Sequence, residues 1–269
     1  MKRYEMVEAK RKFMPLLPII VRIDGKCFHN WTDNLDRPFD SRLHCIMMET
    51  TAALVRATGA VVGYTQSDEI SLILYSGDYK SQVYFDGRIS KIVSVIASIA
   101  TCSFNHLVQS WIPENAGLHA YFDTRAWQVP NKIEATNTIL WRENDCTKNS
   151  LQMLARHYFS HKQLHGLGRA QIHELLHAEG VNSCPTWFKR GSYVRGGDIE
   201  ELNLPPLATI ANRVEVLFDG AYPAILGVDD ERRDEGRCDK GRSEKTSHRA
   251  MGSGPEERRV PASEERALF

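Results

Sequence analysis

Apolar and polar positions in the first half of the chain change their period several times. Short apolar runs typical of strands alternate with longer segments whose apolar residues recur at helical spacing. The expected strands cover residues 17–23, 60–64, 70–75 and 118–129, and the expected helices cover 41–58, which Gly59 ends, and 87–109. This strand–helix–strand–strand–helix–strand order predicts an α+β sandwich built on a ferredoxin-like βαββαβ unit.

The second half of the chain has a different pattern. Residues 133–179 favour helix with a break at Gly166 and Gly168, and the segment from Asn182 onward favours turns and short strands. Of the residues from Val228 to Phe269, 11 are acidic and 10 are basic, and so few are large and apolar that burial cannot offset the entropy of ordering. We therefore expect a core over 1–135, a helical and short-strand part of the same unit over 136–227, and a mostly disordered tail over 228–269.

Charge, cysteine content and apolar stretches indicate which partners and which cell compartment to expect. The formal net charge is zero, with 34 basic and 34 acidic residues, so any surface for nucleic acid must be local. The six cysteines form no CxxC pair, which favours reduced thiols over a disulfide framework or a zinc ribbon. The charged N-terminus lacks the pattern of a secretory signal, and no apolar stretch approaches transmembrane length. We expect a cytoplasmic protein that does not span a membrane.

Acidic residues stand at the ends of two expected strands. Asp24-Gly25 closes the apolar run that begins at Leu16, and Asp68-Glu69 precedes the run 70–75. The βαββαβ order puts the first strand at the sheet centre, so Asp24 and Asp68 can converge at one edge. Because side chains alternate along a strand, we expect Asp68 and Glu69 to face opposite sides, with Asp68 beside Asp24 and Glu69 bracing the site. Two such carboxylates suit a two-metal phosphoryl-transfer site, although the same residues also occur in ordinary turns.

Several segments carry a resemblance to a known family. In this order along the chain, they are similar to motifs of the tRNA(His) guanylyltransferase family, and the likeness covers roughly residues 5–225: Arg22–His29, Gly63–Ser71, Phe85–Lys91, Phe122–Arg125 and Trp141–Cys146. The resemblance implies a palm-like catalytic domain over 1–135, similar to the palms of polymerases. It also implies that the enzyme adds nucleotides to the 5′ end of tRNA.

The resemblance assigns roles to individual residues. Asp24, the Gly25 carbonyl and Asp68 would hold two Mg²⁺ ions, with Glu69 as a third catalytic carboxylate. Arg88 and Lys91 lie one helical turn apart and would neutralise phosphate charge. The residues implied around ATP, GTP or another nucleoside triphosphate are Asp24, Gly25, Lys26, Cys27, Phe28, His29, Arg37, Asp40, Ser67, Asp68, Arg88 and Lys91.

The implied reaction has two stages. ATP first adenylylates a 5′-monophosphate RNA end, and the 3′-hydroxyl of an incoming nucleotide then attacks with release of AMP. A 5′-triphosphate end would bypass the first stage and release pyrophosphate. Bound metal ions would lower the pKa of the attacking hydroxyl and stabilise the leaving group.

One departure from the eukaryotic motif narrows the expected substrate. The chain has Thr147 and Gln152 where eukaryotic members have His and Tyr, which resembles the bacterial and archaeal guanylyltransferase-like branch. That branch favours templated repair of truncated tRNA 5′ ends, so addition of G to tRNA(His) becomes the less favoured reaction. The family also implies a homotetramer, and the residues suggested for tRNA contact are Asn149, Lys189, Arg190 and Arg195.

Two other functions compete with this interpretation. His173-Glu174-Leu175-Leu176-His177 matches HExxH, the zinc motif of metal-dependent hydrolases, and Glu200 or Glu201 could supply a third ligand. An ordinary amphipathic helix explains the same spacing. A non-catalytic RNA-binding module on a ferredoxin-like sheet is the other alternative, although RNP-type aromatic motifs are not evident.

Overall fold

The described residues contain one antiparallel sheet whose five strands follow the order β4-β1-β3-β2-β5. The computed structural model describes residues 1–181, 184–196 and 210–219, all within a single unit, Met1–Gly236. β1 lies between β4 and β3 and is antiparallel to both, as the βαββαβ pattern predicts. The strands are β1 (Ile19–Gly25), β2 (Val62–Gln66), β3 (Glu69–Leu74), β4 (Phe122–Gln128) and β5 (Ser192–Val194).

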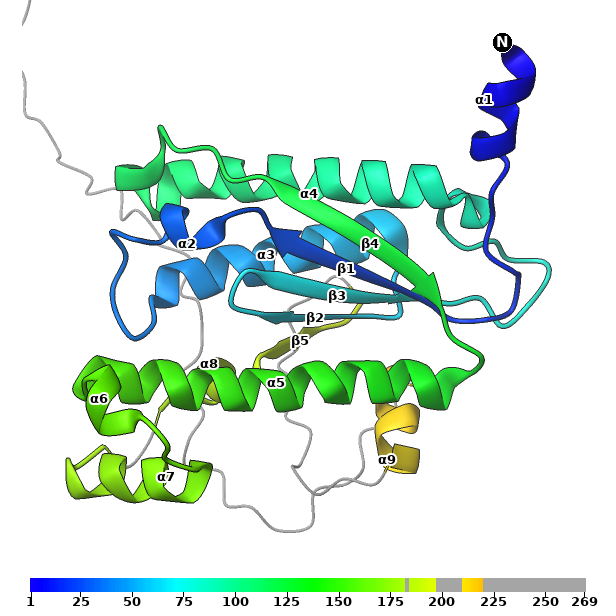
Figure 1. Cartoon of the computed structure of the whole chain (residues 1–269). Coiled ribbons are helices and arrows are strands. Elements are labelled where there is room, and N and C mark those ends of the chain that lie inside the picture. The colour runs from blue at the N-terminus through cyan, green and yellow to red at the C-terminus, as the bar shows by residue number, and fades with distance from the viewer. Residues whose placement is uncertain (182–183, 197–209, 220–269) are drawn as a thin grey trace, which may run out of the picture. The chain divides into compact units, whose positions relative to one another are not determined.

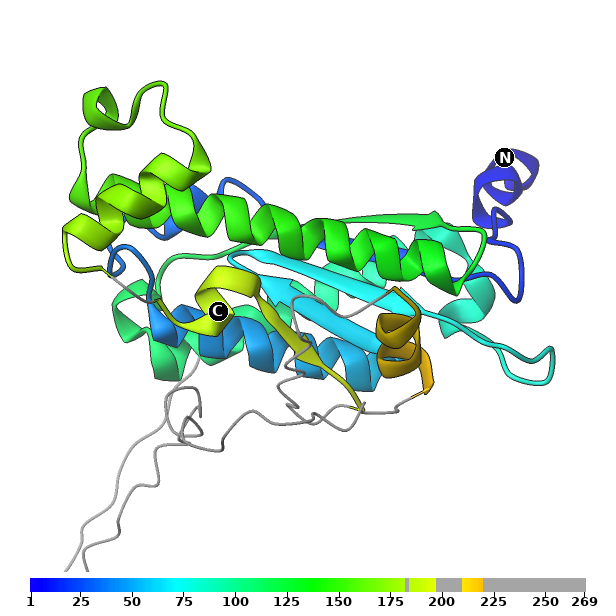
Figure 2. The ribbon, with the colours of Figure 1, turned by 90° about the horizontal axis from the view of Figure 1, so that it is seen from below.

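Three long helices cover the two faces of this sheet. Figure 1 shows α3 (Ser41–Thr58) and α4 (Ile89–Trp111) on one face and α5 (Lys132–Tyr158) on the other. Figure 2 shows α6 and α7 gathered at one end of α5, where their apolar residues form a small separate cluster. The remaining helical segments are α1 (Lys2–Ala9), α2 (Phe28–Trp31), α6 (His161–Leu164), α7 (Arg169–Ala178), α8 (Thr186–Arg190), α9 (Ile210–Val214), the 3₁₀ turns Tyr84–Gly87 and Pro113–Asn115, and the π turn Glu215–Asp219.

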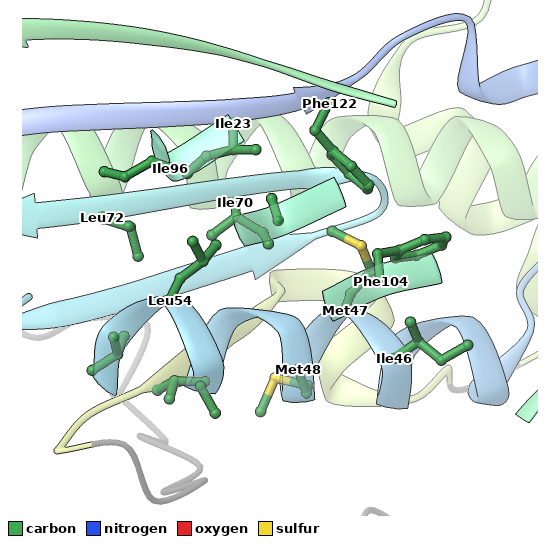
Figure 3. Packing of buried hydrophobic residues seen from close by; sticks show 14 of the residues in the cluster. Ile23, Ile46, Met47, Met48, Leu54, Ile70, Leu72, Ile96, Phe104 and Phe122 are labelled. Atoms are coloured by element: carbon green, nitrogen blue, oxygen red, sulfur yellow. The ribbon is translucent and has the colours of Figure 1, made fainter. Parts of the chain in front are cut away.

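Alternation along β1 decides which of its residues reach the site. Ile19, Val21 and Ile23 point into the main core with α3 and α4, and Figure 3 shows Ile23 near Ile96 and Ile70. The even-numbered residues point the other way, so Ile20 packs in the cluster under α5. Arg22 and Asp24 therefore face α5 as well.

The expected elements agree with the structure in type and order. Helix α3 begins and ends where the pattern predicts, because the Asp40 side chain caps its first turn and Gly59 ends it with a φ of 65°. β2 begins two residues later than expected, and β4 begins at Phe122 instead of residue 118. The helical stretch 133–179 breaks first at Phe159, whose extended backbone is followed by the Ser160 capping box of α6.

Helix α4 corrects the expectation that no segment could span a membrane. Its 23 residues are apolar enough by length and composition to do so. Five of its side chains are nevertheless buried along one face, which is the arrangement of a core helix: Ile92, Ile96, Ala100, Phe104 and Val108. Spacings of three or four residues place them on one stripe of the helix, which packs toward the sheet.

Two further expectations concern the cysteines and the domain boundaries. Of the described cysteines, Cys27, Cys102, Cys146 and Cys184 are free thiols. The predicted tail 228–269 lies outside the described residues. The expected division after residue 135 falls inside α5, and it stays a prediction.

Candidate functional site

A cavity of about 850 Å³ lies on the α5 side of the sheet, at the end of β1 and β3. Segments from α3, α5 and α8 close it from other directions. Its lining includes aromatic side chains as well as carboxylates and cations. Seven of the residues predicted for the site line this cavity: Asp24, Arg37, Asp40, Ser67, Asp68, Glu69 and Asn149.

A tight turn brings Asp68 to the cavity. Gln66 pairs with Glu69, so Ser67 and Asp68 form a two-residue hairpin turn in which Ser67 has a φ of 49°. Asp68 therefore precedes β3 and does not follow the alternation of its side chains. Both residues line the same cavity, and the expectation that their side chains face opposite sides of the sheet stays a prediction.

Gly25 is required where β1 meets this turn. A Cβ atom at residue 25 would lie 2.5 Å from Cδ2 of Phe28 and 3.0 Å from Oδ2 of Asp68. Phe28 cannot move aside, because it is buried and its ring packs against Trp31, Phe104 and Phe122. A glycine thus lets the backbone at the end of β1 approach the Asp68 carboxylate.

The Asp24 and Asp68 carboxylates resist ionisation. The pKa of Asp68 is raised to about 6, first by burial and then by the nearby charges of Asp24 and Glu69. The pKa of Asp24 is also raised, first by burial and then by the charges of Glu69 and Asp123. Arg125 opposes this trend, since its NH2 atom lies 3.5 Å from Oδ2 of Asp24. A bound cation would relieve the repulsion between these groups.

Glu69 is held by arginines. Arg142 of α5 donates from Nε to Oε1 at 2.7 Å and from NH2 to Oε2 at 2.6 Å, which is a two-point ion pair between largely buried side chains. Nε of Arg22 lies 3.4 Å from the same Oε1. Both oxygens of Glu69 are therefore engaged by protein, which suits the bracing role predicted for this residue.

The donor set fits magnesium better than a metal that requires a full protein cage. Within the part of the chain that the structure describes, no three His, Cys, Asp or Glu side chains form a metal-binding group. Mg²⁺ is commonly held by one or two carboxylates, with water and substrate phosphates as its other ligands. Asp24, Asp68 and the Gly25 carbonyl would be the protein ligands of such an ion.

The comparisons with known proteins now decide the family. The sequence model described as tRNAHis guanylyltransferase matches residues 1–130. The tRNA(His) guanylyltransferase of Schizosaccharomyces pombe is 32% identical over 213 residues, which are 71% of this chain and 78% of that protein. This chain belongs to the tRNA(His) guanylyltransferase family. Members of the family are nucleotidyltransferases, so the chain is grouped with enzymes of tRNA processing.

Solved structures of the family share this fold. A bacterial tRNA(His) guanylyltransferase-like protein in complex with ATP matches with a TM-score of 0.69 and 38% identity, over 73% of this chain and 86% of that chain. A bacterial protein with the same description in complex with GTP matches with a TM-score of 0.62 and 36% identity, over 72% of this chain and 83% of that one. The mixed α/β architecture predicted from the sequence is therefore confirmed.

The loop after Asp24 offers backbone groups more than side chains. Lys26 donates its backbone N–H to the Tyr121 carbonyl at 2.8 Å, so that amide is already used. Helix α2 then begins at Phe28 after Cys27, which has a φ of 52° and provides no side-chain cap. The side chains of Lys26, Cys27 and His29 are exposed. The first-turn amides thus remain the part of this loop suited to phosphate, as the resemblance implies.

Arg37 and Asp40 are both engaged by the protein. Arg37 donates from NH2 to the Thr32 carbonyl at 3.1 Å. Asp40 accepts from the backbone N–H of Arg42 at 2.9 Å and from the Arg42 guanidinium at 3.1 and 2.7 Å, and it is 7% exposed. Asp40 is therefore first of all the N-cap of α3, although it also lines the cavity.

Arg88 and Lys91 lie at the opposite end of the sheet from Asp24. Arg88 bridges to Lys12, and Met14 donates to the Gln128 side chain at 3.1 Å. Gln128 pairs with Ile19, the first residue of β1, whereas Asp24 is near its last. The family-implied phosphate role for these two cations is therefore not supported within one chain. The reason is topological, because β3 leads away from the Asp68 turn and α4 begins after it.

The residues suggested for tRNA contact divide into two kinds. Asn149 and Lys189 are exposed, and Asn149 lines the cavity. Arg190 instead pairs with Glu143, which is buried, and Arg195 donates to the Val216 carbonyl at 2.9 Å.

The HExxH segment lies on α7, away from the sheet carboxylates. Ile172 and Leu176 are buried in the small helical cluster, and both histidines are exposed on the other side of α7. Glu200 and Glu201 lie outside the described residues. The structure thus presents α7 as an ordinary amphipathic helix.

The cationic partners of the carboxylates, Arg125 and Arg142, are not among the residues predicted for the site. Arg125 lies opposite Arg22 across the β1–β4 ladder, and Arg142 binds Glu69. Period-two alternation was the available signal for Arg125, because it shares a face with Asp123, the partner of Asp24. No local pattern indicated Arg142, whose contact depends on how α5 crosses the sheet.

Proposed function

We propose that this protein is a nucleotidyltransferase that adds nucleotides to the 5′ end of tRNA by two-metal catalysis, and that addition is templated. The observation that carries the proposal is the convergence of Asp24 and Asp68 on one cavity, at the end of the two central strands. Carboxylates with raised pKa values at such a place are typical of a site built for a cation. Family membership supplies the reaction class.

The cavity would bind the nucleoside triphosphate substrate. Relatives of known structure hold ATP or GTP, and a cavity of about 850 Å³ accommodates a nucleoside triphosphate. The Ser67 hydroxyl and the α2 amides would bind phosphate oxygens, and the aromatic side chains at the other part of the lining would contact the base. Magnesium ions, when bound, supply charge stabilisation at the phosphoryl group and acidify the attacking hydroxyl.

Templated addition is supported by the residues at the eukaryotic motif. Thr147 donates its hydroxyl to the Glu143 carbonyl at 3.0 Å, so it offers no imidazole in place of the eukaryotic His. Gln152 lines the cavity where eukaryotic members have Tyr. With these two groups changed, pairing with the opposing strand becomes the source of base choice.

The test is an addition assay with the full-length protein. A tRNA lacking its first 5′ nucleotide is supplied with Mg²⁺, ATP and all four nucleoside triphosphates, and the opposing base is varied. We expect the added nucleotide to follow the opposing base, and Asp68→Asn to lower the rate by about a thousandfold or more. Addition of G against every base would contradict templating. Full activity in Asp68→Asn would contradict two-metal catalysis, whereas a wild-type protein that binds the tRNA and adds no nucleotide would favour a non-catalytic RNA-binding role.

A further inference from the structure

Asp24 lies between a cavity and an open edge of the sheet. On one side is the cavity. On the other is β4, an edge strand of the sheet, whose Asp123 and Arg125 side chains are each 62% exposed. The proposed reaction joins a nucleotide to the end of an RNA. Only the nucleotide fits the cavity, so the RNA end must approach Asp24 from the open β4 side.

An exposed tryptophan stands on this open side. Trp141 of α5 is 56% exposed. Its ring centroid is 5.0 Å from Cζ of Arg22 and 4.9 Å from Cζ of Arg142. Both guanidinium groups contact Oε1 of Glu69, at 3.4 and 2.7 Å, which places them together on the sheet side of the indole. The ring is thus supported from below and open to solvent above.

Strand register places this ring next to the metal-binding end of β1. Arg22 lies opposite Arg125, and Asp24 lies opposite Asp123, all on the face toward α5. Arg22 is also stacked on Trp127, with 5.4 Å between Cζ and the ring centroid. Trp141 therefore lies over Arg22, two residues before Asp24 on the same face of β1, and the exposed Arg125 lies across the ladder from Arg22.

From this juxtaposition we propose that Trp141 is a stacking platform for the 5′-terminal base of the RNA, with Arg125 contacting an adjacent phosphate. The inference rests on the proposed function. A ring fixed by two guanidinium groups loses little freedom when a base covers it. Stacking also accepts every base, because each has a π face. A repair enzyme that meets different 5′ ends needs that tolerance.

The test is a binding cycle between the protein and the RNA. A tRNA acceptor-stem hairpin with a 5′-monophosphate is compared with the same hairpin carrying an abasic 5′ nucleotide, by fluorescence anisotropy. We expect Trp141→Ala to weaken binding of the intact hairpin about tenfold, and the abasic change to weaken wild-type binding equally. In Trp141→Ala the abasic change should have no further effect. An equal abasic penalty in both proteins would overturn the proposal.

Matched variants separate stacking from damage to the fold. Trp141→Phe keeps an aromatic ring and should retain most of the affinity, whereas Tyr79→Ala removes a 76% exposed ring elsewhere and should leave RNA binding unchanged. ATP affinity should be unaltered in Trp141→Ala, because Trp141 does not line the cavity. A change in sedimentation mass of Trp141→Ala without RNA would assign the ring to a protein interface instead. Wild-type protein that stacks the base but adds no nucleotide would refute the proposed function alone.

Discussion

At the scale of single residues, Asp68 carries a cost to stability that its function explains. Its pKa is raised to about 6, mainly by burial, so the folded state disfavours the ionised carboxylate. The penalty is absent below the ordinary pKa near 3.8, grows as the pH rises, and is complete above about pH 6. Asp68→Asn removes the charge and should therefore stabilise the protein by about 2 kcal/mol at pH 8 without Mg²⁺.

Urea denaturation of both proteins at pH 4 and pH 8 measures this difference. At pH 4 the two free energies of unfolding should nearly agree, because Asp68 is then protonated. Mg²⁺ at pH 8 should stabilise the wild type and leave Asp68→Asn unchanged, since binding to the folded state alone raises stability. If Asp68→Asn is less stable than the wild type at pH 8, the ionised Asp68 carboxylate does not destabilise the folded protein.

At the scale of elements, the contact between Glu69 and Arg142 fastens α5 to β3. Both side chains are about one-tenth exposed, at 11% and 10%. Arg142→Met leaves a buried carboxylate with only the longer contact to Arg22, and should destabilise the protein by about 3–5 kcal/mol. Glu69→Leu combined with Arg142→Met should cost clearly less than the sum of the two single changes. Thermal or urea unfolding of the four proteins would show it, and additive losses would contradict a coupled pair.

How much the sequence predicts also depends on the element. Helix α3 is predicted to the residue because its two ends carry their own signals, the Asp40 cap and Gly59. β2 is not, because Ala60 and Val61 are apolar but precede the ladder, which pairs from Val62. The carboxylates of the site follow from strand order, whereas the arginines that hold Glu69 do not. Their positions depend on the path of α5 across the sheet, and no local pattern records that path.

At the scale of the whole molecule, the positions of Arg88 and Lys91 bear on the predicted homotetramer. Arg88 lies sixteen residues before Phe104, which packs against Phe28 near the site, so about 24 Å of helix separate them. The family resemblance gives these cations a role at phosphate. Both statements hold together only if the cations serve the site of another copy of the chain.

Mixed assemblies of two inactive chains test this. One chain carries Arg88→Ala with Lys91→Ala, and the other carries Asp68→Asn. We expect each alone to add nucleotides at least a hundredfold more slowly than the wild type, because one loses phosphate contacts and the other a metal ligand. Co-expressed chains that pair at random should recover about a quarter of wild-type activity, since half of the pairs contain one intact site of two. If the mixture is no more active than the separate chains, Arg88 and Lys91 do not act at the site of another copy. Sedimentation of the wild type reports in parallel whether copies associate at all.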